Sequence, residues 1–173
     1  MLTVRELAED DLPKVHAIDM TERGNKIYTV AGGELLAVPE DWERPPRTQE
    51  TWDRFVGGWR VTLQRGGAAW GAFDGDVMVG IAVLRRHLTS GMDQLSALFV
   101  SRPHRRLGVA GRLVHEVVEA SRAGGAHALY VSATPSPSAI GFYLRQGFGL
   151  AETVNDELYA LEPKDIHMIL KLS

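Results

Sequence analysis

The 173 residues, of which 45% are hydrophobic and 24% charged, have the length and composition of one globular domain spanning 1–173 and exclude a disordered chain. A net charge of −3 argues against a nucleic-acid partner, and the absence of cysteine excludes disulfides, thiolate metal sites and a covalent enzyme thioester. No stretch forms an apolar targeting segment at the N-terminus or approaches the roughly 18 apolar residues of a membrane span, so a cytoplasmic enzyme with no membrane partner is the simplest interpretation.

The N-terminal part shows two helix starts and one stretch without a pattern. Alternating apolar and polar residues predict a strand over Leu2–Glu6. Asp10–Pro13 offers an Asx cap and a proline in the first turn, so a helix should follow. Residues 21–46 lose clear periodicity because glycines and prolines break the pattern repeatedly. Thr48 can cap a second helix, which should end at Gly66-Gly67.

The rest of the chain predicts antiparallel strands and then one strand–helix–strand crossover. Two apolar runs flank an Asp-Gly-Asp turn at 74–76, which is typical of a tight hairpin. A buried strand is expected over 94–100, strands over 128–133 and 166–172, and a short helix that opens at Ser136 and ends before Gly147. A helix over 105–123 should bury Leu107, Ala110, Leu113, Val114, Val117 and Val118. The fold class is α/β (α+β).

A short loop after the strand at 94–100 is a candidate phosphate site. The first turn of a helix carries unpaired N–H groups and a partial positive charge, and Gly108 and Ala110 leave that backbone bare. Arg105 and Arg106 add cationic donors, although their backbone N–H groups matter more in this geometry. An ordinary basic loop in solvent is the alternative. The spacing is neither a Walker A loop nor a three-glycine dinucleotide fingerprint.

Two motifs together resemble one family. Arg105-x-x-Gly108-x-Ala110 is similar to the Arg/Gln-x-x-Gly-x-Gly/Ala signature of the GNAT superfamily of N-acetyltransferases. The segment from Ser136 to Phe148 resembles that family's second motif, Asn-x-x-Ala-x-x-Phe-Tyr-x-x-x-Gly-Phe. Ser136 stands where members often carry asparagine, so its alternative role is a helix cap. The resemblance covers roughly residues 77–148.

The resemblance implies a mixed, mostly antiparallel sheet flanked by helices, with a V-shaped opening between the strands at 95–100 and 128–133. The pantetheine arm of acetyl-CoA would enter this opening. Tyr143 would protonate the departing thiolate, the alternative being a core tyrosine with its hydroxyl hydrogen-bonded. A backbone N–H of the strand at 98–100 would face the thioester oxygen. The expected cofactor-binding residues are Leu98, Phe99, Val100, Arg105, Arg106, Leu107, Gly108, Val109, Ala110, Gly111, Ser136 and Phe142.

Acyl transfer to an amine also needs a group that takes the amine's proton, because an alkylammonium of pKa ~10 is mostly unreactive at neutral pH. Many relatives use a glutamate where this chain has Gln94, which cannot accept a proton. Asp93 is the neighbouring candidate, and a turn residue at the start of the strand is its alternative role.

The expected activity is acetyl transfer from acetyl-CoA to an amine of a small molecule or peptide. Gln94 keeps open a second function, a non-catalytic acyl-CoA sensor, and a structural domain is a third, weaker alternative. The histidines show no metal-ligand spacing, so no metal is predicted. The oligomeric state, monomer or homodimer, is left open. Acceptor contacts could come from Trp42, Trp52, Trp59 and Trp70 with the acids among them, or from Glu157 and Tyr159, although core packing is the better explanation for any single tryptophan.

Overall fold

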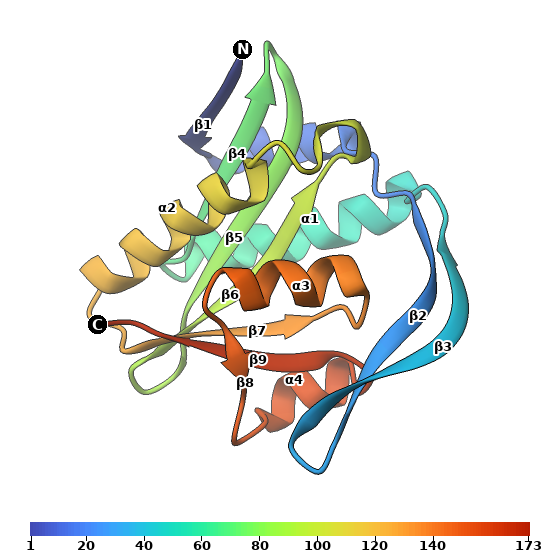
Figure 1. Ribbon diagram of the computed structural model, residues 1–173. Coiled ribbons are helices and arrows are strands. Elements are labelled where there is room, and N and C mark those ends of the chain that lie inside the picture. The colour runs from blue at the N-terminus through green and yellow to red at the C-terminus, as the bar shows by residue number, and fades with distance from the viewer.

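A seven-stranded sheet organises the chain (Figure 1). The computed structural model describes residues 1–173. All neighbouring strands of this sheet are antiparallel except β6 and β7, which confirms the mixed, mostly antiparallel sheet. In sheet order the strands are β1 (Leu2–Glu6), β4 (Ala68–Asp74), β5 (Val77–Thr89), β6 (Met92–Val100), β7 (Ala128–Ala133), β9 (Ile166–Lys171) and β8 (Gly149–Leu150).

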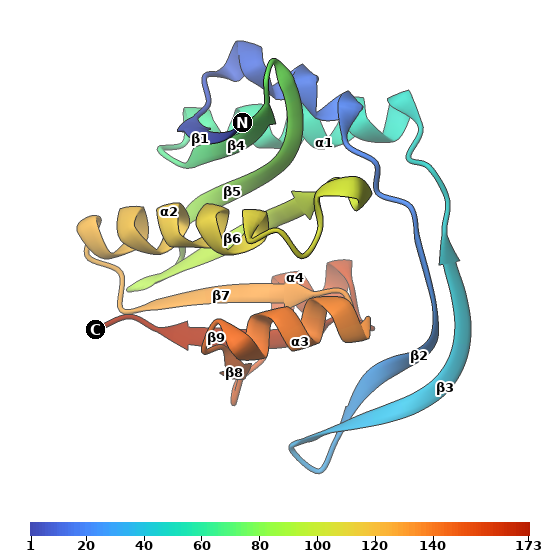
Figure 2. The ribbon, with the colours of Figure 1, turned by 45° about the horizontal axis from the view of Figure 1, so that its top comes forward.

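Helices cover both faces of this sheet (Figure 2). One face carries α2 (Val109–Ala123) and α3 (Pro137–Arg145) over a core of 20 buried residues. The other carries the 3₁₀ helix η1 (Glu9–Ala17) and α1 (Gln49–Gln64) over a core of 14. The short α4 (Asp156–Leu161) lies behind β7 and β9, on the side away from α3. None of the helices has the length and the hydropathy needed to cross a bilayer.

The two central strands separate partway along their length. β6 and β7 pair only where Met92–Gln94 lies beside Ala128–Tyr130, and no ladder joins them beyond that point. A register shift at Ser96 turns Leu95 toward the α2 face and Ala97 toward the α1 face. The V-shaped opening expected from the sequence is therefore present, and it widens toward the carboxyl ends of both strands.

Residues 21–46, which showed no clear pattern, form a long two-stranded hairpin outside the main sheet. Its strands are β2 (Glu22–Ala31) and β3 (Glu34–Arg44), joined at Gly32 and Gly33, both with positive φ. Most of its residues are exposed, so backbone pairing rather than burial holds it together and no apolar alternation appears. The ring of Trp42 fills the space beside Gly24, where a Cβ would lie 2.7 Å from it.

Other boundaries also differ from those expected. η1 is a 3₁₀ helix rather than an α-helix, and the carboxylate of Asp11 accepts the N–H of Ala8 in place of the expected cap at Asp10. α2 begins at Val109, because the positive φ of Gly108 interrupts the helix expected from residue 105. Leu107 consequently lies outside the helix and is 59% exposed. The two-residue β8 and the one-turn α4 gave too little periodicity to be expected.

The remaining expected elements are confirmed. β1, β4, β6, β7 and β9 lie where the sequence patterns placed them, within two residues at each end. β5 starts at Val77 as expected but continues to Thr89, five residues beyond the end of its apolar run at Leu84. Thr48 caps α1 by accepting the N–H of Thr51 at 3.2 Å, and Ser136 caps α3. Local sequence therefore defined most of the sheet and both of these helix starts.

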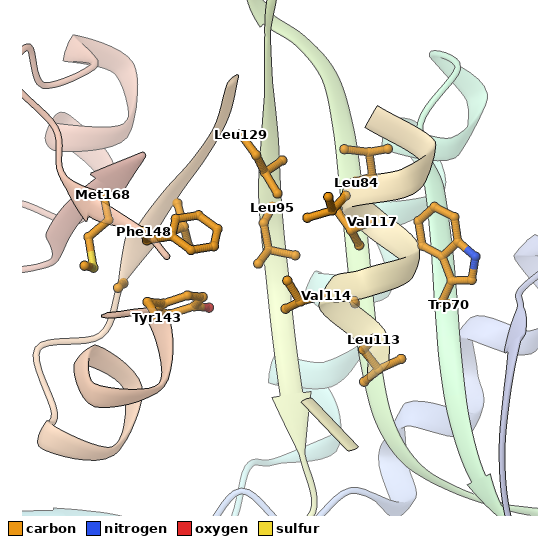
Figure 3. Close-up of a cluster of buried hydrophobic side chains, with 14 of the residues drawn as sticks. Trp70, Leu84, Leu95, Leu113, Val114, Val117, Leu129, Tyr143, Phe148 and Met168 are labelled. Atoms are coloured by element: carbon orange, nitrogen blue, oxygen red, sulfur yellow. The ribbon is translucent and has the colours of Figure 1, made fainter. Parts of the chain in front are cut away.

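We expect Leu113→Ala to lower the free energy of unfolding by about 2–5 kcal/mol, the usual cost of a cavity in a packed core. Leu113 is fully buried between α2 and the sheet (Figure 3). Leu161→Ala is the matched control, because Leu161 is 69% exposed and its loss should change stability by no more than about 0.5 kcal/mol. Urea unfolding measures both, and equal midpoints would contradict this account of the core.

Candidate active site

The loop between β6 and α2 and the first turn of α2 contain backbone N–H groups without a hydrogen-bond acceptor. Those of six consecutive residues, Arg106–Gly111, donate to no acceptor within the protein. Arg106 and Gly108 have φ of 63° and 80°, and Gly108 is the N-cap of α2. Such a turn ahead of a helix N-terminus forms a concave anion site, which we call the Arg106–Gly111 cradle. A Cβ on Gly108 would meet nothing within 4 Å, so the space beside this residue is open.

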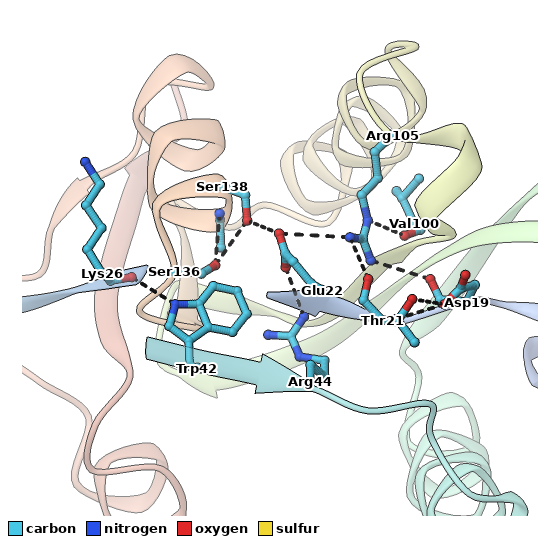
Figure 4. A network of polar contacts seen from close by, with 11 residues as sticks. Asp19, Thr21, Glu22, Lys26, Trp42, Arg44, Val100, Arg105, Ser136 and Ser138 are labelled. Carbon is cyan, nitrogen blue, oxygen red and sulfur yellow. Dashed lines mark hydrogen bonds and ion pairs between the residues drawn. The ribbon is translucent and has the colours of Figure 1, made fainter. Parts of the chain in front are cut away.

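The side chain of Arg105 points away from the cradle (Figure 4). Its guanidinium donates to the carbonyl oxygens of Val100 at 3.1 Å and Thr21 at 3.2 Å, and lies 3.9 Å from the carboxylate of Glu22. The N–H of Arg105 also donates to Arg102. Arg105 therefore ties the loop to the base of the hairpin rather than offering the free cation expected from the sequence.

The edge of β6 that faces the opening has free backbone donors. The N–H of Ser101 donates to Val79 on β5 at 2.8 Å, and successive N–H groups of a strand point to opposite sides. The N–H groups of Leu98 and Val100 therefore point away from β5, toward the opening, where β7 supplies no partner. Phe99 differs, because its backbone faces β5 and its ring packs against Trp52 on the α1 face.

Tyr143 lies on the opposite wall of the opening. It is 7% exposed, and its ring packs edge-on against Phe142 and Phe148 with centroids 5.3 Å apart in each pair. Its hydroxyl, which in Figure 3 points toward β6 and α2 rather than into its own helix, makes no hydrogen bond within the protein. Burial, and to a lesser extent the charge of Asp165, raise the pKa of Tyr143 above its usual range. The phenol therefore keeps its proton at neutral pH and is a potential acid.

Asp93 is enclosed by its own partners. It is 3% exposed and accepts hydrogen bonds from the N–H of His87 at 3.0 Å and from the hydroxyl of Ser121 at 2.7 Å. A guanidinium nitrogen of Arg86 lies 3.6 Å away. Asp93 also pairs with Leu129, in the closed part of the β6–β7 ladder. These contacts favour the structural alternative over a role as the base.

Gln94 belongs to a different polar group. Its side-chain oxygen lies 3.4 Å from Nη1 of Arg85, and the same nitrogen contacts the carboxylate of Glu157 on α4 at 3.0 Å. Glu157 is thereby held by a two-nitrogen contact with an arginine. The position where relatives often carry a glutamate thus offers no free carboxylate.

Two further residues named from the sequence lie on α3. Ser136 is 3% exposed and accepts the N–H of Ala139 at 3.3 Å, so its hydroxyl serves as the helix cap. Phe142 is half-buried and packs against the larger core. Both stand on the wall that carries Tyr143, and the hydroxyl of Ser136 also shares a hydrogen bond with that of Ser138 at 3.2 Å.

The tryptophans are mostly structural. Trp52, Trp59 and Trp70 are core residues, and Trp42 donates to the carbonyl oxygen of Lys26 within the hairpin. Arg47 lies over Trp52, Phe55 and Phe99, with its guanidinium carbon 4.7–4.9 Å from the three ring centroids.

No group of three or more histidine, aspartate or glutamate side chains gathers as a metal site would require.

Sequence reasoning missed Asp165, the residue before β9. The hydroxyl of Ser132 on β7 donates to its Oδ2 at 3.0 Å. Burial raises the pKa of Asp165 to about 6, and the charge of Glu162 adds to this effect. No local signal marks this aspartate, because its surroundings come from three separate segments of the chain.

Comparison with known proteins agrees with this geometry. The model of the Acetyltransferase (GNAT) family matches residues 27–148. No curated protein matches the chain. The crystal structure of nourseothricin acetyltransferase aligns with a TM-score of 0.76 and 19% identity over 99% of each chain.

Two further solved structures share the fold. A Bacillus anthracis protein described as a streptothricin acetyltransferase, solved with acetyl coenzyme A, aligns with a TM-score of 0.76 and 17% identity over 100% of this chain and 99% of the other. The Escherichia coli ribosomal-protein-S18-alanine N-acetyltransferase aligns at 0.61 and 16% identity over 100% and 95%. Because the family model covers residues 27–148, well over half of the sequence, the chain belongs to the Acetyltransferase (GNAT) family.

Proposed function

We propose that this protein transfers the acetyl group of acetyl-CoA directly to an amine of a small molecule or peptide. The observation that carries the proposal is that two walls with different chemical groups face each other across the opening between β6 and β7. The Arg106–Gly111 cradle and the free N–H groups of β6 stand on one wall, and the buried, protonated Tyr143 stands on the other. This arrangement supplies an anion site, an oxyanion donor and an acid within one gap.

Bound acetyl-CoA would supply an acetyl thioester, which an amine attacks at the carbonyl carbon. The cradle would hold the pyrophosphate through backbone N–H groups, which need no positive side chain. The N–H of Leu98 would donate to the carbonyl oxygen as negative charge develops there. The hydroxyl of Tyr143 would give its proton to the departing sulfur, because no group of the protein engages that hydroxyl.

The direct test is a screen of primary amines with acetyl-CoA, in which the release of free thiol is measured and product mass confirms the acetylated amine. We expect at least one amine to give enzyme-dependent thiol release well above hydrolysis of acetyl-CoA alone. Binding of acetyl-CoA by calorimetry without transfer to any amine would instead favour the sensor function, and the amide of Gln94 would then be its explanation. Absence of binding would contradict both functions.

The cradle is tested by Gly108→Val, with Gly125→Val as its control. Gly108 and Gly125 have φ of 80° and 87°, and neither has an atom within 4 Å of an added Cβ, so the two valines should cause similar backbone strain. Only the first would shield the N–H groups of the cradle. At acetyl-CoA one hundred times Kd the wild type should gain ~2.7 kcal/mol of stability. Most of this gain should disappear in Gly108→Val and persist in Gly125→Val, and equal ligand-induced thermal shifts would overturn the assignment.

Tyr143→Phe should lower kcat while leaving the Kd of acetyl-CoA nearly unchanged, because the ring keeps its packing and only the hydroxyl is lost. Loss of a positioned acid typically costs ~10²- to 10⁴-fold, and the effect should be at the low end because a thiolate is a tolerable leaving group. Steady-state thiol release and calorimetry measure the two quantities. Wild-type turnover in the variant would make Tyr143 a packing residue.

A further inference from the structure

The position of Asp165 places a carboxylate at the open end of the gap between β6 and β7. Ile166, the next residue, pairs with Ala133, the last residue of β7. That end of β7 is the one that has separated from β6, because their ladder stops at Tyr130. Asp165 therefore stands where an acceptor would approach the gap, rather than in its closed part.

One oxygen of this carboxylate is free. Ser132 donates to Oδ2 at 3.0 Å, while Oδ1 has no hydrogen bond, and no cationic group forms an ion pair with the side chain. The other carboxylates around the gap are engaged: Asp93 by Ser121, Glu22 by Ser138 at 2.7 Å, and Glu157 by Arg85. Asp165 is thus the carboxylate of this group that can accept a proton without breaking an ion pair.

The neighbouring histidine does not compete for this role. Tyr130 accepts the N–H of Asn155 at 3.0 Å, and its oxygen lies 2.6 Å from Nδ1 of His167. We assign the hydroxyl hydrogen of Tyr130 to this second contact, because the hydroxyl has no other acceptor. Nε2 of His167 then carries the ring hydrogen and is a donor, and burial lowers the pKa of this histidine. His167 is therefore neutral. Its Nε2, which has no hydrogen-bond partner, already carries a hydrogen and cannot take a proton.

The surroundings of Asp165 suit a base that works near neutral pH. Its pKa is raised to about 6, mainly by burial and to a smaller extent by the charge of Glu162 at the end of α4, while the hydrogen bond from Ser132 opposes both effects. The charge of Asp165 also contributes to the raised pKa of Tyr143 on α3, so the two groups lie within electrostatic range of each other. A base of this pKa is mostly ionised at pH 7 yet still accepts protons effectively.

We propose that Asp165 is the general base of the acetyl transfer, an inference that rests on the function proposed above. As the amine nitrogen bonds to the acetyl carbon, Oδ1 of Asp165 takes a proton from that nitrogen. The carbon–sulfur bond breaks, its electron pair stays on sulfur, and Tyr143 donates a proton to it. Asp165 then releases its proton to solvent and Tyr143 regains one, so the net products are an amide and a free thiol.

The central variant is Asp165→Asn, whose side-chain oxygen can still accept from Ser132. We expect kcat to fall by ~10²- to 10⁴-fold, as for other positioned bases, with the Kd of acetyl-CoA changed less than about twofold. Removal of a carboxylate that burial disfavours should leave the melting temperature at pH 7.5 equal or higher, and this gain should shrink below pH 4, where the wild-type group is protonated in both states. The exposed Asp10 supplies the control, Asp10→Asn, with no change in turnover.

The pH profile gives a readout that a merely structural role would not move. In the wild type, protonation of Asp165 should lower kcat/KM about tenfold for each pH unit below about pH 6. Ser132→Ala removes the hydrogen bond that favours the carboxylate, so this break should move to higher pH. Glu162→Gln removes a neighbouring negative charge, so the break should move to lower pH.

The outcomes separate this inference from the proposed function. Wild-type transfer with unchanged kcat in Asp165→Asn, or breaks that do not move in opposite directions, would overturn the role of Asp165 and leave the acetyl transfer intact. A wild type that transfers to no amine would overturn both. Loss of turnover in Asp165→Asn together with loss of acetyl-CoA binding and a lower melting temperature would show a structural role instead.

Discussion

The separation of β6 from β7 after three pairs of residues is the constraint on which the other features of this protein depend. In a sheet, the backbone N–H and C=O groups of each strand normally form hydrogen bonds with the neighbouring strand. Where two neighbouring strands separate, these groups have no partner inside the molecule. Here those groups lie where the two strands have separated. The loop after β6 and the helix after β7 then bring the cradle and Tyr143 to the two walls of the same gap.

The gap is bridged by polar contacts instead of by a ladder (Figure 4). Glu22, at the start of the hairpin, accepts from Ser138 on the β7 side and faces Arg105 on the β6 side. The N–H of Tyr28 donates to Pro135 at 2.8 Å, which adds a second link from the hairpin to the β7 wall. These contacts connect the hairpin to both walls, while the outward N–H groups of Leu98 and Val100 on β6 keep no partner in the protein.

Burial assigns opposite tasks to the ionisable groups on the β7 side of the gap. The phenol of Tyr143 is held protonated, whereas the carboxyl of Asp165 is disfavoured as an anion but still ionised near neutral pH. At neutral pH the ionised Asp165 costs stability through its burial, and the Tyr143 hydroxyl costs stability because it is removed from water without a hydrogen-bond partner. Such a cost is typical of residues that serve chemistry rather than packing, and it contrasts with Asp93, whose partners compensate its burial.

The sequence by itself determined the positions along the chain of most strands of the main sheet, the caps at Thr48 and Ser136, and the motif around Gly108, because each depends on residues close by in the sequence. Only the tertiary structure decided which side chains meet across the gap. The direction of Arg105 away from the cradle, the enclosure of Asp93 and the free oxygen of Asp165 all depend on contacts between segments far apart in the chain. The hairpin over 22–44 belongs with these, because backbone pairing leaves no apolar pattern in a strand exposed on both faces.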